Sequence, residues 1–196
     1  MAERPADGFE VKGITLRGRL DFIAAVHGVD AVERVLGALP PTQASVLRRS
    51  ILATRWYPRV LLQALDDAIC GLLLGDRSPA AYRRLGAEQC AYQRRQGQEL
   101  TGSSPHLAMK GLEAAYRSIH RPGQASYRPL GHLGAEIVVT GVPCVPTQCQ
   151  VNAGFLQELL GQLGVLDVAV QTPRCGIGST RCVYEVHWRL APGRRG

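Results

Sequence analysis

The stretch Cys175-Gly-Ile-Gly-Ser-Thr-Arg-Cys182-Val-Tyr-Glu-Val-His-Trp188 decides the fold. Its second half alternates between two faces of an extended chain. One face carries Cys182, Tyr184, Val186 and Trp188. The other face carries Val183, Glu185, His187 and Arg189. Because a period of two is typical of a strand with one buried face, we expect a strand over residues 182–190.

The segments before this strand extend the same architecture. Residues 125–130 and 135–140 alternate in a similar way, and Gly131 to Gly134 separates them, which predicts an antiparallel hairpin. Thr147 can cap a helix over residues 148–163, and residues 165–172 predict a further strand. The C-terminal part is therefore predicted as strand–strand–helix–strand–strand.

Residues 9–120 are predicted to form the helical part. Ser78-Pro79 and Ser104-Pro105 each combine a capping side chain with a proline suited to the first helical turn. Apolar positions recur at helical spacing over residues 15–27, 30–39, 43–52, 59–74, 78–96 and 106–120.

The fold class expected is α+β, with N-terminal helices packed on a small antiparallel sheet. We expect a disordered lead over residues 1–8, one domain over residues 9–190 and a loose tail over residues 191–196. Within the domain, residues 9–120 form the helical part and residues 123–190 the strand-rich part.

Composition excludes several classes of protein. A hydrophobic fraction of 45% with 20% charged residues is ordinary for a globular chain with a core. The net charge of +7 comes from scattered arginines, so nucleic-acid binding is not expected. No apolar run reaches the ~18 residues that cross a bilayer, and the N-terminus lacks the apolar core of a secretory signal. A soluble cytoplasmic protein is expected.

Four of the six cysteines lie in the C-terminal third: Cys144, Cys149, Cys175 and Cys182. Three interpretations remain open at this point. They are buried unligated thiols, a structural zinc site with four thiolates, or a disulfide, which the reducing cytoplasm disfavours. Six residues separate Cys175 from Cys182, more than the usual zinc spacing of two to four. Two strands that meet at a turn could nevertheless bring both sulfurs together.

No catalytic motif stands out in the sequence. Cys149, near a helix N-terminus, is the residue for which we expect a lowered thiol pKa. His187 would point to the face opposite Cys182 on a regular strand. The glycine-rich piece Gly176-Ile-Gly178 opens no helix and so lacks the form of a phosphate loop. We expect a protein that is not an enzyme.

The C-terminal layout resembles the 4-vinyl reductase domain. The residues that carry the resemblance are the helix Cys149 to Leu163, the strand Val165 to Gln171 and the stretch Cys175 to Trp188. That family is related to aromatic-sensing bacterial activators and to Bet3-type trafficking subunits. Val11-Lys-Gly13 and Trp56-Tyr-Pro58 are similar to a myxobacterial paralogous family of unknown function that has the same C-terminal end.

The resemblance implies a metal site and a homodimer. In the aromatic-sensing relatives, three cysteines and a glutamate bind zinc, and Cys149, Cys175 and Cys182 fall at the cysteine positions. The glutamate position is Thr172 in this chain, so Cys144 would have to supply the fourth ligand.

The function expected is a regulatory or sensory module that binds a small apolar or aromatic ligand. The residues proposed to line an apolar pocket are aromatic: Trp56, Tyr57, Tyr116, Phe155 and Trp188. The same residues would equally fill a closed core. The alternative is a ligand-free adaptor subunit of the Bet3 type that binds another protein.

Overall fold

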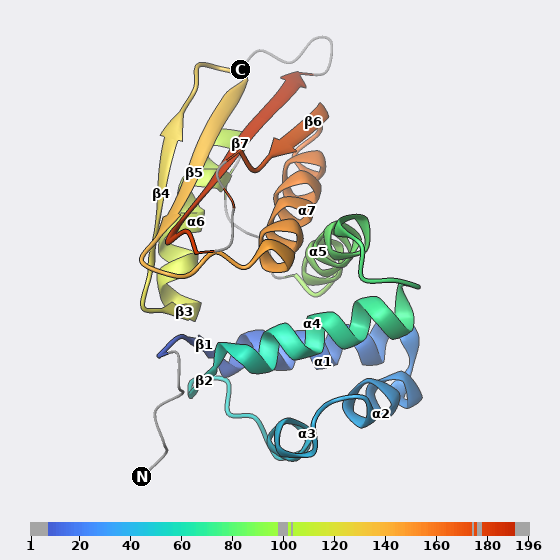
Figure 1. Cartoon of the computed structure of the whole chain (residues 1–196). Coiled ribbons are helices and arrows are strands. Elements are labelled where there is room, and N and C mark those ends of the chain that lie inside the picture. The colour runs from blue at the N-terminus through green and yellow to red at the C-terminus, as the bar shows by residue number, and fades with distance from the viewer. Residues whose placement is uncertain (1–7, 98–101, 103, 174, 176–177, 191–196) are drawn as a thin grey trace. The chain divides into compact units, whose positions relative to one another are not determined.

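The computed structural model of the chain describes residues 8–97, 102, 104–173, 175 and 178–190 (Figure 1). The predicted lead, apart from Gly8, and the predicted tail lie outside these residues. The chain divides into two compact units. The N-terminal unit runs to Ala81 and includes Ser118–Pro122, and the C-terminal unit holds Tyr82–Arg117 and the residues from Gly123 onward. None of the described helices is long and apolar enough to cross a membrane.

Four helices and a small sheet form the N-terminal unit. The helices are α1 (Gly13–His27), α2 (Val29–Gly37), α3 (Pro41–Arg48) and α4 (Arg59–Leu73). The antiparallel sheet has the order β2-β1-β3, with β1 at Glu10–Lys12, β2 at Trp56–Pro58 and β3 at His120–Arg121. This sheet was not predicted, since strands of two or three residues are too short to show alternation.

A buried ion pair joins α1 to α4. Arg19 donates from Nε to Asp66 Oδ1 at 2.6 Å and from Nη2 to Oδ2 at 3.3 Å. Burial raises the pKa of Asp66, and the facing guanidinium acts in the opposite direction. Removing either partner would leave an uncompensated buried charge, so the pair fixes how these two helices face each other.

The C-terminal unit holds the four-stranded antiparallel sheet β4-β5-β7-β6. Its strands are β4 (Gln124–Pro129), β5 (Gly134–Thr140), β6 (Val165–Gln171) and β7 (Arg181–Leu190). Helix α6 (Pro105–Ile119) precedes the sheet, α7 (Pro146–Gln162) joins β5 to β6, and α5 (Pro79–Arg95) belongs to this unit from Tyr82 onward. The α+β class is confirmed, and so is the strand–strand–helix–strand–strand order.

The alternation of β7 is confirmed with one exception. Residues of the predicted inner face are no more than 5% exposed: Cys182, Tyr184, Val186 and Trp188. On the other face His187 and Arg189 are exposed, but Val183 is only 2% exposed. Val183 pairs with Val138 of β5, and the two valines cover each other on the outer face of the sheet.

Helices α5 and α7 approach each other through two glycines. A Cβ atom on Gly86 would lie 1.9 Å from the carbonyl oxygen of Val151, and one on Gly154 would lie 1.8 Å from that of Arg83. Arg83 also donates to Gln150 Oε1 at 2.6 Å and to the Val170 carbonyl at 3.1 Å. The close backbone contact therefore sets the position of α7, the helix that carries Cys149.

We predict that Gly154→Ala lowers the free energy of unfolding by about 2–3 kcal/mol, because the added methyl group meets backbone that cannot move aside alone. Gly161→Ala is the control in the same helix, where a Cβ atom meets nothing within 4 Å. The control should stabilise by roughly 0.5–1 kcal/mol through helix propensity. Urea unfolding measures both, and equal effects of the two substitutions would contradict the close contact.

A histidine in the small sheet makes the free energy of unfolding depend on pH. His120 pairs with Val11, and burial together with the nearby charge of Arg59 lowers the pKa of His120 from 6.5 to about 4. The unfolded chain therefore binds more protons between these two values, and stability falls as the pH drops through this window. We predict a loss on the order of 1–2 kcal/mol between pH 7 and pH 5.

His120→Gln should flatten this part of the stability curve, measured by urea unfolding at pH 7, 6 and 5. Parallel curves for His120→Gln and the unsubstituted protein would show that His120 is not the responsible group.

Candidate metal centre

Four cysteines meet at one end of the large sheet. Cys144 lies in the connection from β5 to α7, Cys149 in the first turn of α7, Cys175 between β6 and β7, and Cys182 near the start of β7. The four Sγ atoms all lie within 4.8 Å of one another. Cys149 Sγ is 3.5 Å from that of Cys144 and 3.3 Å from that of Cys182. The structure thus brings together all four predicted metal ligands.

Backbone pairing produces this convergence. Strands β5 and β7 pair with Val139 opposite Cys182. Beyond their ends, the amide of Gly141 donates to the Thr180 carbonyl at 3.2 Å, and that of Cys144 to the Ser179 carbonyl at 2.7 Å. The two connections that carry the cysteines are therefore held against each other.

Helix α7 begins earlier than predicted. Val145 is its N-cap residue and Pro146 opens the first turn, so the expected cap at Thr147 is wrong. Proline suits this position because its missing N–H would have no partner inside the helix. The Cys149 amide then donates to the Val145 carbonyl at 3.0 Å, which places the thiol in the first turn.

The thiols of the cluster are largely buried. Cys144, Cys149 and Cys182 are at most 6% exposed, and Cys175 is intermediate. Burial raises the pKa of Cys144 to about 12. The hydrogen bond with Cys182, and then burial, raise the pKa of Cys149. The lowered pKa expected for Cys149 at a helix N-terminus is therefore wrong for the free thiol.

The spacing of the sulfurs suits one tetrahedral ion. A metal ~2.3 Å from each of four sulfurs would hold them ~3.8 Å apart. The separations between 3.3 and 4.8 Å bracket this value. A cluster of several iron ions would hold its cysteine sulfurs farther apart, since several ions lie between them. Cys144 fills the place that the resemblance gave to a glutamate at Thr172, so four sulfurs are available.

Tyr184 is a residue near the cluster that sequence analysis assigned only to the core. Its hydroxyl accepts from Asn152 Nδ2 at 3.1 Å. The sequence does hold a signal for this arrangement. Asn152 follows Cys149 by three residues in a helix, and Tyr184 follows Cys182 by two in a strand, so each shares a face with a cysteine.

The aromatic residues predicted to line a pocket fall in different units. Trp56 and Tyr57 lie on β2 of the N-terminal unit. Trp56 stacks under the cations of Lys12, at 5.2 Å from the ring centroid, and Arg121, at 4.4 Å. The Tyr57 hydroxyl accepts from the Leu52 amide at 3.0 Å. Local contacts of the N-terminal unit thus account for both residues.

The other three predicted pocket residues belong to the C-terminal unit. Trp188 is 3% exposed and meets the ring of His106 edge-on at 5.0 Å, whereas Tyr116 and Phe155 are half-buried. Neither unit by itself therefore holds the five residues together.

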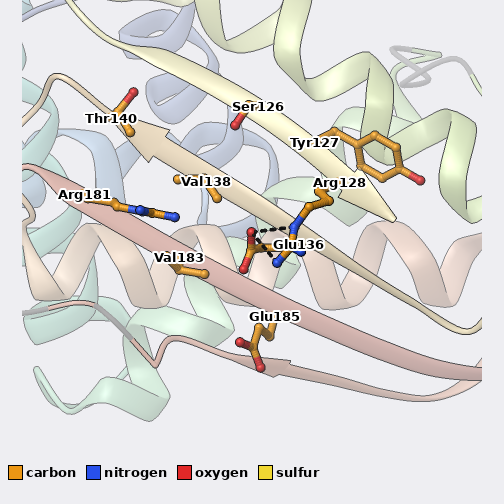
Figure 2. A pocket seen from close by; sticks show the side chains of 9 residues that line it. All are labelled: Ser126, Tyr127, Arg128, Glu136, Val138, Thr140, Arg181, Val183 and Glu185. Carbon is orange, nitrogen blue, oxygen red and sulfur yellow. Dashed lines mark hydrogen bonds and ion pairs between the residues drawn. The ribbon is translucent and has the colours of Figure 1, made fainter. Parts of the chain in front are cut away.

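A hollow of about 720 Å³ lies on the outer face of the large sheet, and no cysteine lines it (Figure 2). Val138 and Val183 line it together with polar residues of β4, β5 and β7, among them Arg181 and Glu185. Arg128 is ion-paired with Glu136 at 3.2 Å across its floor, as the dashed lines in Figure 2 show. The hollow is open and charged, unlike the closed apolar pocket that the sequence led us to expect.

Comparisons with known proteins identify the fold. No protein-family model matches the chain, and neither does any curated protein. Solved structures do match. An H-NOX protein from S. oneidensis in the Fe(II)NO ligation state is 13% identical, with a TM-score of 0.67 over 91% of this chain and 99% of that chain. Fe(II) unliganded H-NOX from K. algicida is 8% identical, with a TM-score of 0.65 over 94% of this chain and 100% of that chain. The chain has the H-NOX fold.

This result corrects the family resemblance. The neighbours match nearly the whole chain, helical part included, and they are H-NOX structures. The likeness to the 4-vinyl reductase domain, and with it the Bet3-type and myxobacterial relatives, is wrong. The motifs behind it were a helix, two strands and a cysteine pair, an order that different folds share.

Proposed function

We propose that the protein is a sensory module of the H-NOX fold whose C-terminal unit is organised by a metal ion bound to four cysteines. The observation that carries the metal site is the approach of four Sγ atoms to within 4.8 Å. The sensory role is supported by a fold match to H-NOX proteins over nearly their whole length, one of them in a state described by its bound NO.

Zinc is the ion that the ligand set favours. Four thiolates in a tetrahedron select zinc, or iron in a mononuclear site, over the hard cations that prefer oxygen. Four protein ligands leave no open position for water or substrate, so the ion has a structural role. We propose accordingly that the module is not an enzyme and works in the cytoplasm, where its thiols stay reduced.

We predict one zinc ion per chain in protein purified without chelators, measured by mass spectrometry of the metal content. Cys149→Ser should lose most of the metal, because a hydroxyl is a poor substitute for a thiolate at this site. Cys90→Ser is the matched control: Cys90 is also buried in the C-terminal unit and lies outside the cluster. Equal metal content in the two variants would contradict the site.

Haem is named by one structural neighbour, a structure about haem redox potential and protein-induced porphyrin distortion. A haem iron requires an axial ligand such as a histidine with a free ring nitrogen. In the described part of the C-terminal unit, both nitrogens of His106 are engaged, Nδ1 with Tyr127 Oη at 2.6 Å and Nε2 with the His132 carbonyl at 3.2 Å. His132 and His187 are exposed.

The N-terminal unit offers His27 and His120. His27 packs edge-on against the fully buried Phe22 at 5.9 Å, and its Nε2 has no hydrogen-bond partner. His120 pairs with Val11 in the small sheet, where it is buried near the charge of Arg59. Among these residues only His27 keeps a ring nitrogen without a hydrogen bond. Haem is not part of the proposed function, and the His27→Ala variant below tests this exception.

We predict that haem added to the purified protein gives the absorption spectrum of free haem, without the sharp Soret band of a ligated iron. A ligated spectrum would contradict this conclusion. His27→Ala and His106→Ala would then identify the unit that holds the iron, since only the variant lacking the true ligand would lose the band.

The homodimer and the small apolar ligand remain predictions. The dimer was inferred from the 4-vinyl reductase resemblance, which no longer applies, and neither feature enters the argument for the metal site.

A further inference from the structure

The small sheet of the N-terminal unit has one buried face and one charged face. Val11 of β1 is fully buried and pairs with Tyr57 on one side and His120 on the other. Because successive residues of a strand point to opposite faces, the residues next to these three lie on the second face. They are Glu10 and Lys12 of β1, Trp56 of β2 and Arg121 of β3.

Trp56 is the centre of the charged face. Lys12 Nζ lies 5.2 Å from the centroid of the Trp56 ring, and Arg121 Cζ lies 4.4 Å from it, across β1. Both distances are measured to one ring, so the two cations lie within about 10 Å of each other. A guanidinium that stacks on a ring still offers N–H donors at its edge, in a geometry that matches a carboxylate.

Cations outnumber acids on this sheet. The three strands and the residues next to their ends contain four cations and one carboxylate: Lys12, Arg55, Arg59, Arg121 and Glu10. Arg55 lies over the ring of Tyr57 at 5.8 Å, and Arg59 lies over that of Phe9 at 4.9 Å. A ring attracts a cation and holds it in place without neutralising its charge. The sheet therefore carries a surplus of positive charge at fixed positions.

We propose that the face formed by Lys12, Trp56 and Arg121 binds an acidic segment of another protein, with two carboxylates of that segment paired to Lys12 and Arg121. Carboxylates on every second residue of an extended peptide are ~7 Å apart, which suits two cations at this separation. The Glu10 carboxylate already accepts from Arg121 Nε at 2.6 Å, so this guanidinium is shown to take a carboxylate at its edge. The inference goes beyond the sensory role and does not depend on the metal site, which lies in the other unit.

Other anionic partners fit this face less well. Single-stranded nucleic acid is held by bases that stack on open aromatic rings, whereas two cations already lie over the Trp56 ring. A membrane surface would require Trp56 to project into the headgroups, but this side chain is half-buried. A second copy of the chain would bring the same cations and a net charge of +7, which disfavours the contact.

A fluorescein-labelled peptide of alternating glutamate and alanine, twelve residues long, tests the proposal in an anisotropy titration of the full chain at low salt. We expect the peptide to bind, and Lys12→Gln/Arg121→Gln to weaken binding about tenfold, because two exposed ion pairs are lost. Arg48→Gln/Arg84→Gln is the matched control. It lowers the net charge by the same amount at exposed positions on α3 and α5, and should change the affinity by less than about twofold.

Trp56→Leu distinguishes a built site from attraction to net charge, since it removes the ring and keeps every cation. We expect it to weaken peptide binding about threefold, because Lys12 and Arg121 are no longer held in place. Urea unfolding checks that each variant is folded. If Trp56→Leu does not fold, the comparison of the two double variants decides by itself.

Several results would overturn the proposal. One is an unsubstituted protein that does not bind the peptide, and another is equal affinity of the two double variants, which would leave net charge as the cause. Binding of oligothymidylate or phosphatidylserine vesicles in place of the peptide, lost in Lys12→Gln/Arg121→Gln, would assign the face to that class of partner. A dimer in sedimentation that this variant dissociates would assign it to a second copy.

Discussion

The register between β5 and β7 is the constraint on which the rest of the C-terminal unit depends. With Val139 opposite Cys182, the thiol of Cys182 faces α7 and lies close to the point where the chain leaves β5. The chain then turns through Cys144 and enters α7 at Cys149. A slip of one residue would move Cys182 to the outer, charged face of the sheet and separate it from the other three thiols.

Two further sets of contacts hold α7 in the position that brings Cys149 beside Cys182. The glycine contact with α5 fixes the helix through backbone atoms, which cannot adjust as side chains do. Asn152 and Tyr184 link the helix to β7 beside the cluster. In our account the metal adds a last connection among elements that already converge.

Local signals in the sequence predict much of this fold. Proline after serine marks the starts of α5 and α6, and the alternation in β7 places four side chains on its inner face. The four cysteines could be named as ligands from their residue type and their place around a turn. Other features depend on distant pairing: His120 joins Val11 across more than a hundred residues, and no local pattern indicates such a strand. Val183 is buried because of its neighbour on β5, which its own strand does not reveal. The family could not be predicted because the quoted motifs are common to unrelated folds.

X-ray absorption at the zinc edge of the purified protein tests the central claim most directly, because it reports the atoms around the ion itself. Our account predicts a single shell of four sulfur neighbours at ~2.3 Å. A shell that contains nitrogen or oxygen, or a protein in which the metal is absent, would contradict it.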